Sequence, residues 1–243
     1  MIHYLSAGAP IASVGCYLAP IPTIKDVVHT GTVGSLPMLP YSAMASNAFM
    51  WCTYGIMKHQ ASIWSCNGIG FVLAMYYMFQ FAQYVPNKRT KESTVAAMLD
   101  ASTPTLPGTV RQHVMGVAAV IAGTTLLALI QPFATRTANV IGNIAVLFCI
   151  LMFASPLSVI QVVLRTKSAK SIPLPFTIVS SLNCFLWVVF GWFKLQDVNV
   201  WLPNSLGLTF GMIQVILKLV FGDHHDGSSS LPTTNYSPVN LAP

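Results

Sequence analysis

Asparagine and tryptophan side chains recur at matching places in two apolar stretches of the chain. Six of them form three pairs: Asn47 with Asn183, Trp51 with Trp187, and Asn67 with Asn204. An amide offers two donor hydrogens and two acceptor lone pairs, which suits the vicinal hydroxyls of a sugar. An indole face offers a flat apolar surface for the C–H side of a sugar ring. The six residues together predict a binding site for a neutral polyol.

The spacing of these residues places them on helix faces. Asn47, Trp51 and Tyr54 are four and three residues apart, so they share one face of a helix, and Phe190 completes the matching face with Asn183 and Trp187. A single asparagine within a membrane often bonds only a neighbouring helix, and a single tryptophan often anchors at the interface. The repetition favours the ligand site, because a site on a pseudo-two-fold axis needs equal groups from both halves.

The composition shows in which medium the helices lie. The chain is 54% hydrophobic and 7% charged, against roughly 25% charged in soluble domains. We therefore predict an all-α integral membrane protein. Seven stretches poor in charge are long enough to span the hydrocarbon, which takes roughly 20 helical residues: residues 4–24, 37–57, 63–85, 114–133, 138–164, 173–193 and 200–220.

The repeat divides the seven transmembrane helices into a 3+1+3 arrangement. The predicted units are a first triple-helix bundle (1–87), an inner loop with linker helix (88–135), a second triple-helix bundle (136–221) and a disordered tail (222–243). The fourth helix has no counterpart, and it returns the chain to its starting side. The two bundles are therefore expected to be parallel, with a pathway along the seam between them.

Basic residues predict the orientation. With the N-terminus outside, nine of the twelve Lys and Arg residues lie on the inner side and three on the outer side, so we expect an outer N-terminus and a cytosolic C-terminus. The outer three are Lys58, Arg136 and Lys194. The formal charge of +6 is thus a topology signal, and nucleic acid is not expected as a partner. The plasma membrane is the expected location, with an organelle membrane as the alternative, and the expected partners are the bilayer, the solute that binds the site and a second copy of the chain.

Acidic and histidine side chains avoid the centres of the predicted spans. All six acids and all six histidines fall in loops, at helix ends or in the tail. Ion-coupled carriers usually bury a carboxylate or imidazole to carry the driving charge, so uncoupled transport is predicted. The chain has no nucleotide-binding loop and no CxxC spacing. We expect no catalysis, cofactor or metal.

Prolines recur at the predicted inner ends of the helices. Pro20 and Pro156 lie near the ends of the first and fifth spans, where a missing backbone donor loosens a helix and permits a hinge. Pro40 and Pro173 open the second and sixth spans, where proline is also a favourable first-turn residue. Pro37 competes with Pro40 for the second position, since the repeat favours Pro37.

These motifs together closely resemble the eukaryotic SWEET sugar transporters, over roughly residues 18–221. The motifs are Ala19-Pro20-Ile-Pro-Thr23, Leu39-Pro40-Tyr41, Asn67-Gly-Ile-Gly70, Ala154-Ser155-Pro156-Leu157-Ser158, Thr166-Lys-Ser168 and Pro203-Asn204-Ser-Leu-Gly207. The resemblance implies facilitated movement of mono- or disaccharides through two parallel bundles.

The resemblance also implies roles for single residues. Asn67 and Asn204 would be the paired sugar-binding asparagines, and Trp51 and Trp187 would line the cavity. The proline tetrad of an inner gate would be Pro20, Pro40, Pro156 and Pro173. Tyr54 and Asp197 match an outer gate pair, although one extra residue between Trp187 and Asn204, expected in the outer loop, shifts the alignment near Asp197.

Two other functions remain open at this point. The first is a related PQ-loop transporter for amino acids or other solutes. Against it stand the absence of a Pro-Gln dipeptide and of an acidic residue that would hold an ammonium group. The second is a non-transporting membrane receptor with the same fold.

Overall fold

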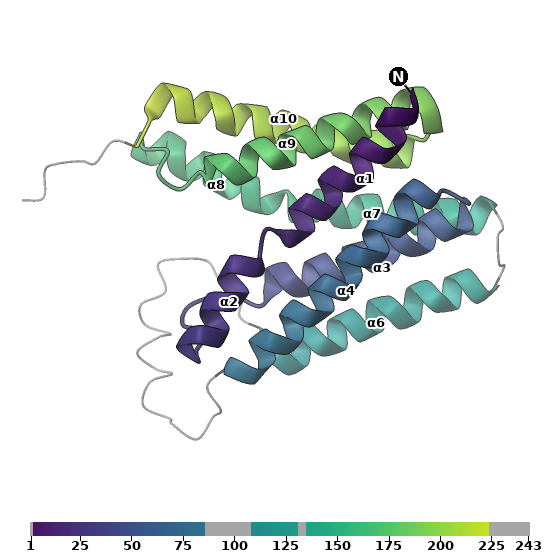
Figure 1. The fold of residues 1–243 in the computed structure, drawn as a ribbon, viewed down its shortest axis with the longest axis horizontal. Helices are drawn as coiled ribbons and strands as arrows, with labels where there is room; N and C mark the ends of the chain where they lie inside the picture. The colour runs from purple at the N-terminus through teal and green to yellow at the C-terminus, as the bar shows by residue number, and fades with distance from the viewer. Residues whose placement is uncertain (1, 86–107, 131–134, 224–243) are drawn as a thin grey trace, which may run out of the picture.

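The structure is a computed structural model that describes residues 2–85, 108–130 and 135–223. Every regular element in these ranges is a helix. Most of the predicted inner loop before the linker helix and nearly all of the predicted tail lie outside the described residues. The helices form two groups whose long axes run in similar directions, one built from each half of the chain (Figure 1).

The first group and the linker helix follow the predicted spans. The first group consists of α1 (Ile2–Leu18), α2 (Ile21–Thr30), α3 (Leu39–Met57) and α4 (Ala61–Tyr84), and the linker is α6 (Val110–Ile130). The second group consists of α7 (Thr135–Met152), α8 (Ala154–Thr166), α9 (Leu174–Phe190), the π-helix η1 (Gly191–Leu195) and α10 (Val198–Phe221). By length and composition, five described helices can cross a membrane: 7–30, 110–130, 135–166, 174–195 and 198–221.

The first helix of each group is interrupted rather than ended at its proline. Pro20 is the N-cap of α2, which continues for 10 residues, and Pro156 lies in the first turn of α8, which runs for 13 residues. Both prolines were expected near the inner ends of their spans, whereas a helix continues past each of them, to Thr30 and to Thr166. The span was ended at residue 24 because Lys25 and Asp26 are charged, but a helix can carry charge beyond the hydrocarbon.

The extra residue of the second repeat lies in a helix, which corrects its expected place in the outer loop. The π-helix η1 follows α9 directly, and a π-turn accommodates one more residue than an α-turn. His59 and Gln196, which follow this point in the two repeats, both have left-handed backbone with φ of 52° and 50°. The loops therefore correspond again at these residues, with an offset of 137.

The packing of the two groups differs between their ends. We call the end where α1 begins the N-terminal end, and the end that carries Thr30 and Phe221 the opposite end. In the N-terminal half, one hydrophobic cluster joins both repeats, with Trp51 and Tyr54 of α3, Ile141 of α7 and Phe190 of α9. Towards the opposite end the cores separate. One contains only residues of α2, the α2–α3 loop, α3, α4 and α6, and the other only residues of α8, the α8–α9 loop and α10.

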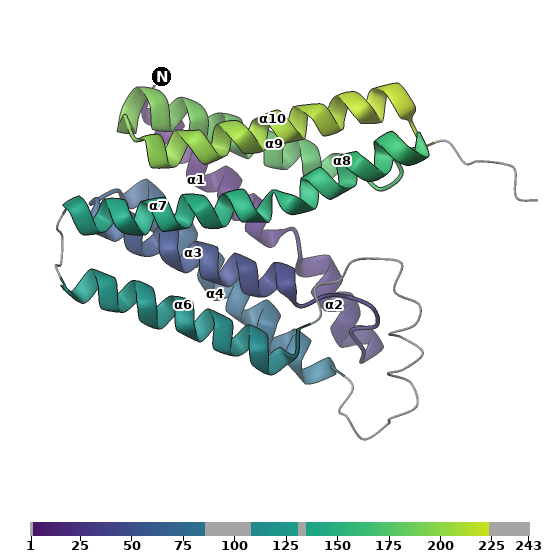
Figure 2. The ribbon, with the colours of Figure 1, turned by 180° about the vertical axis from the view of Figure 1, so that it is seen from behind.

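The ribbon agrees with this division. Figure 2 shows α2 and α8 well apart at the opposite end, while α3 and α7 run side by side nearer the N-terminal end. Across the repeats, α1 packs against α9 and α3 packs against α7. The linker α6 packs mainly against α3, where Ser42 Oγ and His113 Nδ1 are 2.9 Å apart. The linker therefore belongs structurally to the first group.

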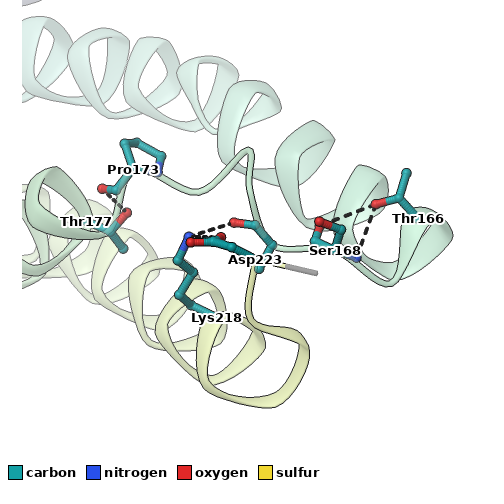
Figure 3. Close-up of polar contacts among 7 residues, drawn as sticks. Thr166, Ser168, Pro173, Thr177, Lys218 and Asp223 are labelled. Carbon is teal, nitrogen blue, oxygen red and sulfur yellow. Dashed lines mark hydrogen bonds and ion pairs between the residues drawn. The ribbon is translucent and has the colours of Figure 1, made fainter. Parts of the chain in front are cut away.

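A polar cluster fixes the opposite end of the second group (Figure 3). Lys218 Nζ on α10 donates to the carbonyl of Ala169, at 3.0 Å, and pairs with the carboxylate of Asp223 at 2.5 Å. The Ala169 amide in turn donates to the Gly222 carbonyl at 2.8 Å. The α8–α9 loop is thereby bound to the end of α10.

Candidate substrate-binding cavity

A cavity of about 220 Å³ lies between the two repeats. All six asparagine and tryptophan residues predicted for the site line it: Asn47, Trp51, Asn67, Asn183, Trp187 and Asn204. No residue of its lining, within the described part of the chain, carries a charge. The uncharged, amide-rich lining suits a neutral polar solute.

The two tryptophans are held rigidly at the cavity wall. Trp51 is 8% exposed and Trp187 6% exposed. Each ring makes an edge-to-face contact with the aromatic residue three positions further along its helix, Tyr54 at 5.4 Å and Phe190 at 5.9 Å between centroids. Such pairs stabilise a fixed ring orientation. The cavity therefore has two preformed aromatic walls, one from each repeat.

Ser13 of α1 connects the first repeat to the asparagine and tryptophan of the second. The indole nitrogen of Trp187 donates to Ser13 Oγ at 2.7 Å, and Ser13 Oγ donates to Asn183 Oδ1 at 2.9 Å. Ser13 is buried, at 8% exposure. The first helix of one repeat thus completes the polar wall that the second helix of the other repeat provides.

Cys149 of α7 is the equivalent of Ser13 in the second repeat, and it bonds the asparagine of the first repeat. It follows Ser13 by 136 residues, the repeat offset, and its thiol donates to Asn47 Oδ1 at 3.2 Å. We predicted neither Ser13 nor Cys149 as a site residue. The signal that could have found them is their shared offset, which pairs a hydroxyl with a thiol.

Asn67 and Asn204 lie in the second turn of α4 and of α10. In both, the amide nitrogen donates to the carbonyl four residues earlier, Ile63 at 2.8 Å and Val200 at 2.7 Å. Their carbonyl oxygens differ, however, because Tyr17 donates to Asn67 Oδ1 at 2.7 Å. Tyr17 also lines the cavity and was likewise not predicted as a site residue.

The predicted outer gate pair is in contact at the N-terminal end. Tyr54 Oη donates to Asp197 Oδ2 at 2.5 Å, joining α3 of one repeat to the N-cap of α10 in the other. Asp197 Oδ1 accepts from the Asn199 amide at 3.0 Å, which orients the carboxylate. Gly142 of α7 packs so closely here that a β-carbon on it would lie 2.6 Å from the Tyr54 ring. The cavity is closed at this end.

The four predicted gate prolines lie away from the cavity. Pro20 and Pro156 are at the interruptions of the first helices, Pro40 is the second residue of α3, and Pro173 is the N-cap of α9. None of them belongs to the cavity lining.

The fold and the cavity define a class of protein. Two pseudo-symmetric helix groups enclose an uncharged, amide-rich cavity at their interface, closed at one end and flanked by separate cores at the other. This is the architecture of a membrane carrier for a small polar solute, with the site at the interface of its repeats.

Comparison with known proteins identifies the family. Residues 3–89 and 139–226 match the profile of a family described as sugar efflux transporter for intercellular exchange. Among similar proteins, the bidirectional sugar transporter SWEET7b of Oryza sativa subsp. japonica is 30% identical over 214 residues, 87% of this chain and 74% of the relative. The bidirectional sugar transporter SWEET10 of Arabidopsis thaliana is 30% identical over 205 residues, 84% of this chain and 65% of that protein.

A solved structure shows the same fold. The structure of a eukaryotic SWEET transporter matches with a TM-score of 0.71 at 23% identity, covering 90% of this chain and 96% of that chain. The chain therefore belongs to the MtN3/SWEET family and has its fold of seven transmembrane helices in a 3+1+3 arrangement.

Proposed function

We propose that this protein carries mono- or disaccharides across a membrane by facilitated, bidirectional diffusion. The observation that carries the proposal is the cavity between the repeats, which both halves line with asparagine and tryptophan at equivalent positions. Family membership supports it, since the similar proteins are named bidirectional sugar transporters. Amides bind the hydroxyls of the sugar and the indole faces cover its C–H surface.

The uncharged lining supports a uniport mechanism. No carboxylate, ammonium or imidazole group faces the cavity among its described lining residues, and a coupled carrier needs such a group to bind the driving ion. The same feature argues against the amino-acid alternative, because nothing in this lining would neutralise an ammonium group. Flux should therefore follow the sugar gradient alone.

The arrangement of the cores supports alternating access. The N-terminal end is sealed by the shared core and by the hydrogen bond between Tyr54 and Asp197. The cores of the opposite end do not join. With the N-terminal end outside, as the basic residues predict, this conformation faces the cytosol. Transport then requires the two groups to rock about the central cavity, with Pro20 and Pro156 as hinges and the four prolines as the inner gate.

The proposal includes the membrane in which the protein lies and its contact with a second copy of the chain. We place the protein in the plasma membrane, with the N-terminus outside and the C-terminus in the cytosol. Large apolar side chains such as Val72, Leu129 and Leu219 are exposed, which fits contact with lipid or with a second copy of the chain.

Sugar flux into proteoliposomes tests the function. Wild-type protein should equilibrate one or more of glucose, fructose and sucrose, without accumulation, and a protonophore or the removal of sodium should leave the rate unchanged. Asn204→Ala removes a cavity amide and should weaken sugar affinity roughly ten- to a hundredfold. Asn139→Ala, at an exposed asparagine of α7, is the matched control and should behave as wild type.

Three results would contradict the proposal. Accumulation of sugar above its outside concentration, abolished when an ion gradient collapses, would show coupling. Amino-acid flux without sugar flux would favour the PQ-loop alternative. Absence of flux for every solute would favour a receptor.

A further inference from the structure

The two equivalent asparagines of the cavity differ in their hydrogen bonds. Asn67 has partners for both of its polar atoms: its oxygen accepts from Tyr17 at 2.7 Å, and its nitrogen donates to the Ile63 carbonyl and to the Cys66 sulfur. Asn204 donates to the Val200 carbonyl, and its oxygen accepts no hydrogen bond from the residues that the structure describes. Asn67 is also buried at 9% exposure, whereas Asn204 is half-buried.

A single hydroxyl group accounts for this difference. Phe153 follows Tyr17 by 136 residues and takes its place in the second repeat, where both rings line the cavity. Each ring packs on a glycine of the third helix of its repeat. A β-carbon on Gly70 would overlap the Tyr17 ring, and one on Gly207 would contact the Phe153 ring at 3.5 Å. The two rings thus have equivalent positions, but only Tyr17 reaches its asparagine with a donor.

A hydrogen bond from α4 holds the backbone of Tyr17 in place. Tyr77 of α4 donates to the Tyr17 carbonyl at 2.8 Å, next to the interruption between α1 and α2. The Tyr17 hydroxyl therefore remains beside Asn67 without a sugar. On the other side of the cavity, Phe153 contacts Phe210, with 5.4 Å between the ring centroids, and provides no polar group.

We propose that Tyr17 lowers the affinity for the sugar by occupying the Asn67 oxygen with its hydroxyl in this conformation. The sugar then binds first to the residues of the second repeat. This inference rests on the proposed function, since it concerns the same cavity. Asn204 offers a free acceptor to a sugar hydroxyl. A sugar hydroxyl that donates to the Asn67 oxygen must share this acceptor with the Tyr17 hydroxyl or displace it, and either lowers the affinity. The two repeats therefore bind the sugar with different strength, although their residues are arranged symmetrically.

Tyr17→Phe tests this proposal, because it makes the first repeat resemble the second. Loss of the competing hydrogen bond should tighten sugar binding roughly two- to tenfold. Binding is measured on purified protein with glucose, fructose and sucrose, using the sugars that wild-type protein transports. Phe153→Tyr is the matched converse. It places a hydroxyl beside Asn204 and should weaken binding by a similar factor.

Alanine variants of the asparagines separate this role from simple helix packing. Asn204→Ala should weaken binding at least tenfold and Asn67→Ala less than about threefold. The gain from Tyr17→Phe should disappear when Asn67→Ala is also present, as in a double-mutant cycle. A hydroxyl that only ties α1 to α4 would instead lower the melting temperature when removed, with no gain in binding.

The outcomes distinguish the two proposals. If wild-type protein transports sugar but Tyr17→Phe binds it equally or more weakly, the role of Tyr17 is refuted and the sugar function stands. Equal losses in the two alanine variants would also refute it. If wild-type protein neither binds nor transports any sugar of the panel, the proposed function itself fails.

Discussion

Gly142→Ala should open the N-terminal end of the cavity. A β-carbon at this position would lie 2.5 Å from Asn199 Nδ2 and 2.6 Å from Cε2 of Tyr54, well inside van der Waals contact. Tyr54 and Asn199 both bond Asp197 in the closed gate. The added methyl group therefore destabilises the conformation with the gate closed and leaves the conformation with the gate open unaffected. Overpacking of this kind costs typically 1–3 kcal/mol, which shifts the ratio of the two conformations roughly 5- to 150-fold.

Thiol labelling measures this shift. Cys184 lines the cavity and is free, so a membrane-impermeant maleimide applied to intact cells reaches it only through an open outer end. Its labelling rate, followed by mass spectrometry of the modified peptide, should rise in Gly142→Ala. Gly123→Ala in α6 is the matched control, because a β-carbon there meets nothing within 4 Å.

One result would refute this reasoning. If Cys184 of Gly142→Ala is labelled no faster than in Gly123→Ala and in wild type, close packing at Gly142 does not hold the gate closed. The gain in helix propensity from Gly to Ala, about 1 kcal/mol, does not explain a difference, because both variants share it.

Three further perturbations test the gates and the opposite end. Pro20→Ala and Pro156→Ala restore a backbone donor, so each should slow turnover and leave sugar affinity nearly unchanged; parallel losses of binding and flux would contradict a hinge. Tyr54→Phe removes the hydrogen bond to Asp197 and should raise outside labelling of Cys184 roughly five- to tenfold; an unchanged rate would mean that the shared core alone closes this end. Lys218→Met removes the contact to the α8–α9 loop at Ala169 and the pairing with Asp223 after α10, and should lower the melting temperature in detergent by about 2–4 °C; an unchanged melting curve would contradict that role.

The repeated asparagines and tryptophans made the cavity predictable because such groups are costly in an apolar medium. Asn47 and Asn183 recur at one offset beside Trp51 and Trp187, and all four line the cavity. A buried amide needs a partner, so its repetition carries information about a shared site. The outer pair of Tyr54 and Asp197 was found through the family resemblance and is in contact in the structure.

Other site residues were not found in this way, although Ser13 and Cys149 share the repeat offset. Ser13, Tyr17 and Cys149 are single small or aromatic residues within apolar stretches, where core packing explains them equally well. Only the folded chain shows that each bonds a residue of the predicted site. The fold had similar limits: an alignment reveals one extra residue in the second repeat, but hydrogen bonding decides that it enters the π-helix Gly191–Leu195.

The unequal division of the hydrophobic cores makes the conformational equilibrium sensitive to temperature. Opening the N-terminal end exposes part of the shared core around Trp51 and Ile141 to water, while closing the opposite end covers a different apolar surface. Unless the two areas are equal, the two conformations differ in heat capacity, since apolar exposure raises it. Warming or cooling alone then changes which side of the membrane the empty carrier faces, and influx and efflux acquire different temperature dependences.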